Sequence, residues 1–205
     1  SSSIELENGV ILSNKYSYLE DGMIIKYSAE GECEWAKVIG GSDYDQIKAV
    51  AETSDGGLIA GGYFLSASID LGNGVVLTNN GDTSYSDGMI IKYSEEGECE
   101  WAKGIGGSSY DQINAVASTS DGGIIAGGEF ISSSIDLGNG VSLTNKGNNN
   151  GMIIKYSSSG ECEWAKVIGG DDYDYIESVA ETSDGGIIAG GYFESDIIDL
   201  GNGVS

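Results

Sequence analysis

Residues 21–41 read DGMIIKYSAEGECEWAKVIGG, and the chain repeats this segment twice with few changes. Residues 87–107 read DGMIIKYSEEGECEWAKGIGG, and residues 150–170 read NGMIIKYSSSGECEWAKVIGG. The copies begin at positions 21, 87 and 150, so their offsets are 66 and 63 residues. A period of this length is typical of an array of supersecondary units in which each unit packs against its neighbours.

The similarity continues downstream of this segment. Residues 44–64 read YDQIKAVAETSDGGLIAGGYF, and near-copies begin at Tyr110 and Tyr173. We divide the chain into the tail of an incomplete preceding repeat (1–20), repeat 1 (21–86), repeat 2 (87–149) and a truncated repeat 3 (150–205). Because both ends fall in the same segment of the unit, we expect further repeats in a longer parent chain or completion by a homo-oligomer.

The unit contains strand signals and no helical periodicity. In the first copy these signals lie at residues 23–28, 32–39, 47–53 and 57–64. The turn Ser54-Asp55-Gly56-Gly57 between the last two supplies the positive φ angles of a tight hairpin. Gly61 and Gly62 within a strand predict a bulge or a close backbone approach. Frequent glycine, no proline and short strands together predict an all-β fold.

A longer segment separates the strand at 57–64 from the next copy of the strand at 23–28. In the first copy this insert spans residues 65–86, and it contains the sequence IDLGNGVVLT with Asn73 and Gly74 at its centre. An Asn-Gly pair between short apolar runs predicts a small hairpin. The insert differs in length between copies, which accounts for the two different offsets.

Three tracts carry a resemblance to a known family: DLGNGVSLTN (136–145), GMIIKYSSSGECEWAKVIGG (151–170) and VAETSDGGIIAGGYF (179–193). They resemble the bacterial β-propeller repeats called SBBP repeats, and the likeness covers essentially the whole chain. It implies propeller blades: three four-stranded repeats of about 65 residues, with the inserted hairpin between the second and third strands. It also implies a bacterial protein that is extracellular or on the cell surface, and it brings no catalytic motif.

The resemblance further implies a geometry for ligand binding. The strands at 47–53 and 57–64 would be the inner strands, and the loop before them would share one face with the insert. Ligands of β-propellers usually bind on that face. Since propellers typically have four to eight blades, three units imply missing blades or an oligomer that completes the ring.

The charge of the chain limits its partners. The formal net charge is −24, with nine Lys or Arg residues and no His. Nucleic acids and anionic membranes would be repelled by such a surface, whereas cations or a basic partner are compatible with it. The acidity is also explained by solubility alone. No run approaches 18 apolar residues, so we expect no membrane span.

The most regular polar feature is a Tyr-Asp pair before the inner strand of each unit. The candidate ligand or cation residues are Tyr44, Asp45, Tyr110, Asp111, Tyr173 and Asp174, with Asp43, Asp171 and Asp172 beside them. A ring of carboxylates could hold a hard cation such as calcium, the one cofactor we consider. The alternative is structural, because Asp before a strand can cap the turn by accepting backbone N–H bonds.

One cysteine and one tryptophan recur in each unit. They are Cys33, Cys99, Cys162, Trp35, Trp101 and Trp164. Equivalent positions of successive units should lie too far apart for a disulfide, so we expect the cysteines to be free and packed. The tryptophans would be packing anchors between units, or stacking surfaces for sugars if they are exposed.

Composition argues against an enzyme. Paired carboxylates leave glycoside hydrolysis open, but no His activates a nucleophile and no polar residue distinguishes one copy from the others. We therefore expect a non-enzymatic secreted or surface module that binds a protein, a glycan or a cation. The alternatives are a purely structural array, as an assembly unit of a surface layer or appendage, and a glycan-active enzyme fragment.

Overall fold

The protein is described here by a computed structural model that covers residues 3–16, 18–81, 83–198 and 200. The described chain is all-β apart from one 3-10 turn, Glu7–Gly9. The strands are β1 (Ser3–Glu5), β2 (Ile11–Ser13), β3 (Gly22–Tyr27), β4 (Cys33–Ile39), β5 (Asp45–Glu52), β6 (Leu58–Phe64), β7 (Ser68–Asp70), β8 (Val76–Thr78), β9 (Asp87–Tyr93), β10 (Cys99–Ile105), β11 (Asp111–Ser118), β12 (Ile124–Phe130), β13 (Ser134–Gly138), β14 (Val141–Thr144), β15 (Asn150–Tyr156), β16 (Cys162–Ile168), β17 (Asp174–Glu181) and β18 (Ile187–Phe193).

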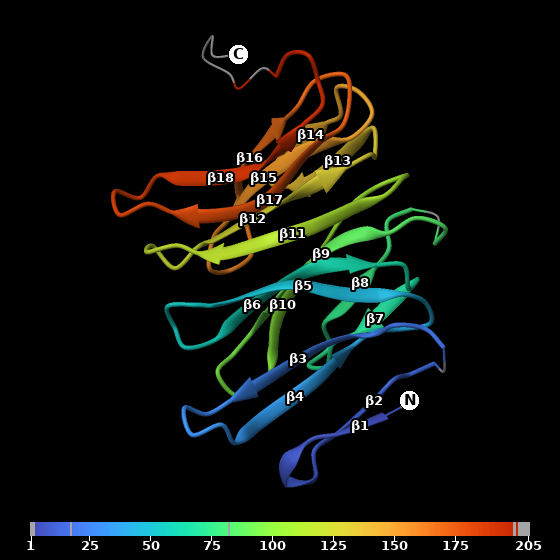
Figure 1. Cartoon of the computed structure of the whole chain (residues 1–205), viewed down its shortest axis with the longest axis vertical. Coiled ribbons are helices and arrows are strands. Elements are labelled where there is room, and N and C mark those ends of the chain that lie inside the picture. The colour runs from blue at the N-terminus through green and yellow to red at the C-terminus, as the bar shows by residue number, and fades with distance from the viewer. Residues whose placement is uncertain (1–2, 17, 82, 199, 201–205) are drawn as a thin grey trace.

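The strands form two four-stranded antiparallel sheets and several strand pairs. The first sheet has the order β5-β6-β9-β10, and the second has the order β11-β12-β15-β16. An N-terminal pair (β3–β4) and a C-terminal pair (β17–β18) flank them, and three short hairpins (β1–β2, β7–β8, β13–β14) complete the described topology. Figure 1 shows these layers stacked along the long axis, with the β1–β2 hairpin and the N-terminal pair at the bottom and the second sheet with the C-terminal pair at the top.

Each sheet crosses a boundary of the sequence repeat. The first sheet takes β5 and β6 from residues 21–86 and β9 and β10 from residues 87–149. The four predicted strands of one repeat therefore belong to two different sheets. Their positions agree with the sequence prediction within a residue or two, and the predicted inserts form the hairpins β7–β8 and β13–β14.

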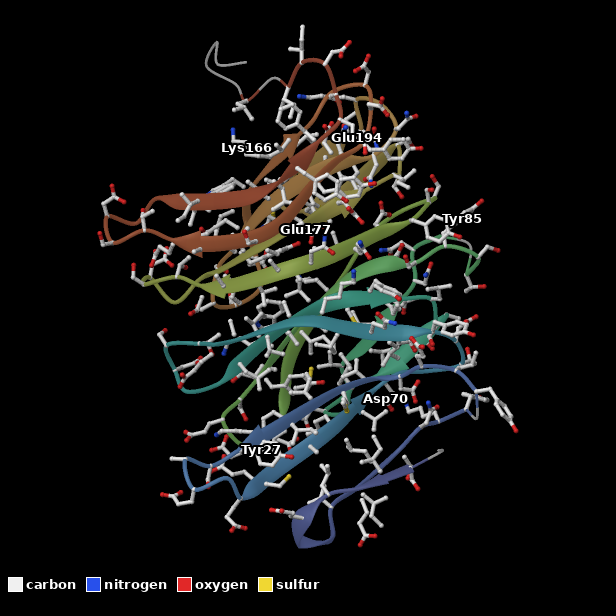
Figure 2. All side chains as sticks on the ribbon, viewed as in Figure 1. Tyr27, Asp70, Tyr85, Lys166, Glu177 and Glu194 are labelled. Atoms are coloured by element: carbon white, nitrogen blue, oxygen red, sulfur yellow. The ribbon has the colours of Figure 1, made fainter. Side chains whose placement is uncertain are left out.

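Side chains from both faces of the central strands are buried. All seven residues of β9 are buried. One apolar cluster includes Ile24 of the N-terminal pair and Phe64 of the first sheet, and a second cluster includes Ile59 of the first sheet and Phe130 of the second. Figure 2 shows side chains filling the spaces between the stacked layers. Because successive side chains of a strand point to opposite faces, each central sheet presents an apolar surface to the layer on either side.

The glycines in the second strand of each sheet allow the bulge that was predicted. The β5–β6 register shifts between Ile47 and Ala49, and a Cβ atom on Gly62 would lie 1.9 Å from the Gln46 carbonyl oxygen. A Cβ atom on Gly128 would likewise lie 2.0 Å from the Gln112 carbonyl oxygen. Only glycine fits such an approach, so the repeated Gly-Gly pair is a requirement of the backbone.

Two junctions connect these layers. In the first junction, β11 of the second sheet packs against β5 and β6 of the first sheet. In the second junction, β17 packs against β11 and β12. Within the described residues, no helix is long and apolar enough to cross a membrane.

Candidate ligand-binding site

The Tyr-Asp pairs lie where predicted, at the start of β5, β11 and β17, and their two members differ in exposure. Asp45, Asp111 and Asp174 are each at most 1% exposed. Each carboxylate accepts hydrogen bonds from a backbone N–H four residues earlier and from the serine that follows the second strand of the hairpin; those serines are Ser66, Ser132 and Ser195. The aspartates therefore close the loop around the hairpin, as in the structural alternative.

The three tyrosines of these pairs remain partly exposed. Tyr44, Tyr110 and Tyr173 are 43%, 49% and 41% exposed, and Tyr110 packs edge-on against Tyr85 with ring centroids 4.9 Å apart. Tyr44 and Tyr110 line a common pocket, which is described below. The tyrosine half of the predicted site is thus available to a ligand.

The additional aspartates do not gather around one point. Asp43 Oδ1 accepts the Tyr44 N–H at 2.9 Å, and Asp172 Oδ1 accepts the Asn148 amide at 3.3 Å. Asp171 is exposed. Among the residues that the structure describes, no three Cys, Asp or Glu side chains are arranged to hold a metal ion. Calcium at these positions stays a prediction.

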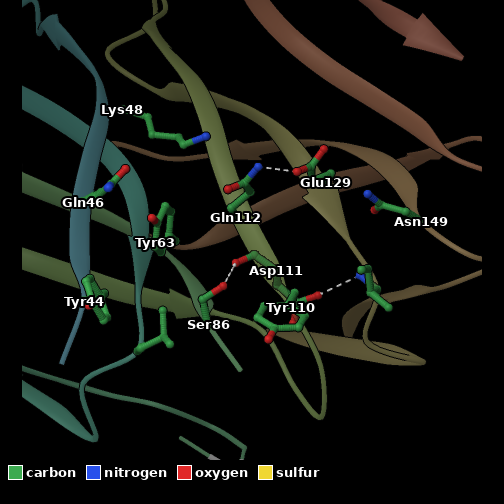
Figure 3. Close-up of a pocket in the computed structure, with 12 residues that line it drawn as sticks. Tyr44, Gln46, Lys48, Tyr63, Ser86, Tyr110, Asp111, Gln112, Glu129 and Asn149 are labelled. Atoms are coloured by element: carbon green, nitrogen blue, oxygen red, sulfur yellow. Dashed lines mark hydrogen bonds between the residues drawn. The ribbon is translucent and has the colours of Figure 1, made fainter. Parts of the chain in front are cut away.

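A pocket of about 410 Å³ opens at the first junction (Figure 3). The first sheet contributes Tyr63 and the amide of Gln46, with the Lys48 ammonium 5.9 Å from the centroid of the Tyr63 ring. The second sheet contributes Gln112 and Glu129. The pocket thus combines aromatic rings with amides, the carboxyl groups of Asp111 and Glu129 and one ammonium, a mixture that suits a small polar ligand.

Two cross-strand pairs line this pocket, and the residues at this position of the hairpin differ in every copy of the repeat. Gln46 faces Tyr63 in the first sheet, and Gln112 faces Glu129 in the second. In the C-terminal pair two tyrosines, Tyr175 and Tyr192, stack with centroids 4.4 Å apart. These registers place one variable pair at the same point of each hairpin. Glu129 is the only carboxylate among them.

Two acceptors beside the pocket are buried without a donor. The Gln112 amide donates to Glu129 Oε1, as Figure 3 shows, whereas Glu129 Oε2 is buried and has no hydrogen-bond partner among the described residues. Asn149, which is 4% exposed, lies beside Glu129, and its Oδ1 likewise has no partner within the described chain. Native proteins leave few buried polar atoms unsatisfied, so this pair of atoms points to a missing donor.

The electrostatic environment of Glu129 follows from the same geometry. Burial raises the pKa of Glu129 to about 6, the Gln112 hydrogen bond opposes this shift, and the charge of Glu177 adds to it. The charge of Lys48 and a side-chain hydrogen bond with Asn149 lower the pKa of Glu129 to a smaller extent. Glu129 is therefore ionised at neutral pH but close to the range in which it takes up a proton.

The expectation that no polar residue distinguishes one copy was wrong. Glu129 stands where the other copies have Tyr63 and Tyr192, and it lines the pocket. The signal in the sequence is the change from GGYF to GGEF. The burial of Asn149 has no such signal, since it depends on how the loop before β15 packs against the loop before β17.

A second difference between the copies lies behind the pocket. It is the first residue of the third strand of each sheet, which is Asp87 in β9 and Asn150 in β15. Lys146 N–H donates to Asn150 Oδ1, and Asn150 Nδ2 donates to the carbonyls of Asn149 and Gly170, both at 3.1 Å. In the preceding copy Asn80 N–H donates to Asp87 Oδ2, while the buried Asp87 Oδ1 has no partner in the described structure.

The unpartnered oxygen of Asp87 occupies the place of the Asn150 amide nitrogen. A Cβ atom on Gly106 would lie 2.1 Å from Asp87 Oδ1, and one on the equivalent Gly169 would lie 2.6 Å from Asn150 Nδ2. Burial raises the pKa of Asp87. A neutral, protonated Asp87 can donate as the amide of Asn150 does, so the geometry and the pKa agree.

The other repeated residues have packing roles. All three cysteines are free and buried, as expected. Trp101 Nε1 donates to the Ser158 carbonyl at 3.0 Å, and Trp35 Nε1 donates to the Glu95 carbonyl at 3.0 Å. Each of these tryptophans thus joins one layer to the next, as the packing-anchor interpretation predicts.

No protein-family model matches the chain, and no curated protein matches it.

Proposed function

We propose that the chain is a non-enzymatic repeat module of the β-propeller type that binds a small polar ligand, a glycan above all, in the first-junction pocket. The observation that carries the proposal is the pair of buried acceptors, Glu129 Oε2 and Asn149 Oδ1, beside partly exposed tyrosine rings. Tyrosines supply flat apolar surface with a polar end, and carboxylate and amide groups fix orientation.

The sheet architecture supports the propeller part of the proposal. Both four-stranded sheets are antiparallel meanders, and β5, β11 and β17 pack against one another in succession. In a propeller these would be the inner strands of adjacent blades. The resemblance to SBBP repeats supports an extracellular or cell-surface location.

The proposal is tested by screening glycans and other polar small molecules by protein-observed NMR. We expect the ring signals of Tyr44, Tyr63 and Tyr110 to shift on binding. Tyr110→Ala should abolish the shifts, whereas Tyr173→Ala, the equivalent change at the second junction, should leave them intact. Ligands that shift no pocket resonance, or a screen without any binder, would contradict the proposal.

A second candidate function, a structural assembly unit, rests on the edges of the outer strand pairs. In both sheets the second strand pairs with the third, as β6 pairs with β9 and β12 with β15. β18 and β3 are the equivalent second and third strands, and each has one edge without a strand partner in the described part of the chain. β18 of one copy could therefore pair with β3 of another.

Measurement of mass in solution tests the assembly candidate. Light scattering should give a multiple of 21.2 kDa, and Ile188→Pro in β18 should return the protein to one chain. A mass of 21.2 kDa at every concentration would argue against this candidate and leave the binding proposal unaffected.

A further inference from the structure

The two unsatisfied atoms at the first junction restrict the chemistry of the ligand. Glu129 Oε2 and Asn149 Oδ1 are both acceptors. A ligand that satisfies them must bring donors, which hydroxyl and amino groups can do and a carboxylate or phosphate cannot.

The charges around the pocket distinguish among donors. The chain carries a net charge of −24, which opposes an anionic ligand. Lys48 places an ammonium over the ring of Tyr63 and already offsets part of the charge of Glu129, so a cationic ligand would compete with Lys48 for that carboxylate. An uncharged ligand with several hydroxyl groups avoids both the repulsion by the net charge and this competition.

From these observations we infer that the first-junction pocket binds an uncharged sugar, two hydroxyl groups of which donate to Glu129 Oε2 and Asn149 Oδ1. The inference rests on the proposed function and names the ligand class and the recognising atoms. The C–H face of the sugar would lie against the tyrosine rings, and the amides of Gln46 and Gln112 could exchange hydrogen bonds with the remaining hydroxyls.

The copies of the repeat contain their own control for this inference. At the position of Glu129 the first sheet has Tyr63 and the C-terminal pair has Tyr192, and both fit the same hairpin geometry. Glu129→Tyr should therefore fold while it removes the carboxylate. Circular dichroism and the melting temperature check that it does.

The test uses methyl glycosides of glucose, galactose, mannose and N-acetylglucosamine, with methyl glucuronide and glucosamine as charged counterparts. Saturation-transfer NMR identifies binders, and isothermal titration at pH 7 gives Kd. We expect at least one uncharged glycoside to bind about ten-fold more tightly than the glucuronide and the glucosamine. Glu129→Tyr should weaken it by about ten-fold or more, because the ligand loses a charge-assisted hydrogen bond.

Two further variants separate recognition from charge. Glu129→Gln keeps one acceptor oxygen and should bind with intermediate affinity. Glu161→Gln removes one charge at an exposed residue outside the pocket, and it should bind like the unmodified protein.

Several results would overturn the inference. It fails if no uncharged glycoside binds, if the glucuronide or glucosamine binds as tightly, or if Glu129→Tyr retains full affinity. The proposed function has a separate outcome, since a ligand of another class that shifts the pocket tyrosines would sustain it after the sugar inference had failed.

Discussion

The two junctions between layers have the same backbone and different chemistry. At the first junction the second sheet presents the hydrogen-bonded pair Gln112–Glu129, and at the second the C-terminal pair presents the stacked rings of Tyr175 and Tyr192. The bulge, the paired glycines and the buried Asp–Ser bond are common to both. The repeat therefore determines the scaffold, whereas the chemistry of one cross-strand pair on each hairpin varies between copies.

The carboxyl groups behind the junctions differ as well. Burial raises the pKa of Asp111 to about 6, and Asp87 adds to this effect when it is ionised. Burial also acts to raise the pKa of Asp174, but hydrogen bonds from Gly170 and Ser195 outweigh it and the pKa is lowered. Asn150 stands where Asp87 would be, so the second junction lacks the like charge.

The largest expected effect comes from removing the buried aspartate of each junction. Asp111 accepts hydrogen bonds from the Gly107 N–H and from the N–H and hydroxyl of the buried Ser132, and Asp111→Ala removes this acceptor. We expect a loss of about 3–5 kcal/mol of unfolding free energy, measured by urea denaturation. Asp174→Ala should cost less, since β18 beside it is mostly exposed.

The control for this comparison is Asp43→Ala. Asp43 is only half-buried and its carboxylate accepts the N–H of the adjacent Tyr44, so its loss should change stability by less than about 1 kcal/mol. Equal losses for Asp111→Ala and Asp174→Ala would contradict the account of the two junctions.

A smaller effect is expected from exchanging Asp87 and Asn150. Because the folded state raises the pKa of Asp87 and Asp111, it binds their protons more tightly than the unfolded chain. The stability that the Asp111 proton contributes is complete below pH 3.8, the ordinary Asp pKa, and is lost as the pH rises through about 6. The contribution of the Asp87 proton is likewise lost as the pH rises through its own raised pKa.

Asp87→Asn should place an amide N–H donor at this position at every pH. We expect it to raise stability by about 1–3 kcal/mol at pH 8 and to flatten the dependence between pH 4 and pH 7, as measured by urea denaturation across pH. The reciprocal change Asn150→Asp should lower stability at pH 8 and introduce such a dependence at the second junction. If neither variant changes the pH profile, Asp87 is not protonated in the folded protein.

The smallest expected effect concerns the tryptophans. Trp101→Phe loses the hydrogen bond to Ser158 and should cost about 1 kcal/mol, and Trp35→Phe should behave alike through its bond to Glu95. Trp164, on β16, makes no such bond among the described residues, so Trp164→Phe should cost less. Thermal melts of the three variants would reveal the order, and a larger loss for Trp164→Phe would reverse it.

Much of the fold could be predicted from the sequence. The period, the Asp-Gly turns and the paired glycines predicted the strands, the inserted hairpins and the bulge at Ile47. The period alone does not say which strands pair, but the resemblance placed the inserted hairpin between the second and third strands of a unit, and both four-stranded sheets have that order.

The candidate site was predicted only in part. The Tyr-Asp pairs lie at the predicted position, before the first strand of each hairpin. The sequence does not reveal that each Asp carboxylate already accepts hydrogen bonds from a Ser hydroxyl and from backbone N–H groups. The sequence shows Glu129 as a single substitution, at a position where the other two copies have Tyr. Its meaning depends on the burial of Oε2 and on Asn149, which only the packing of the loops determines.

The decisive experiment is carboxyl-detected NMR of Glu129 during a pH titration, with and without the tightest-binding uncharged glycoside. We expect a midpoint near pH 6 in the free protein. We expect a lower midpoint in the complex, because hydroxyl donors stabilise the carboxylate. A midpoint near 4.5, the ordinary value for Glu, that the glycoside leaves unchanged would contradict the claim that Glu129 receives the ligand.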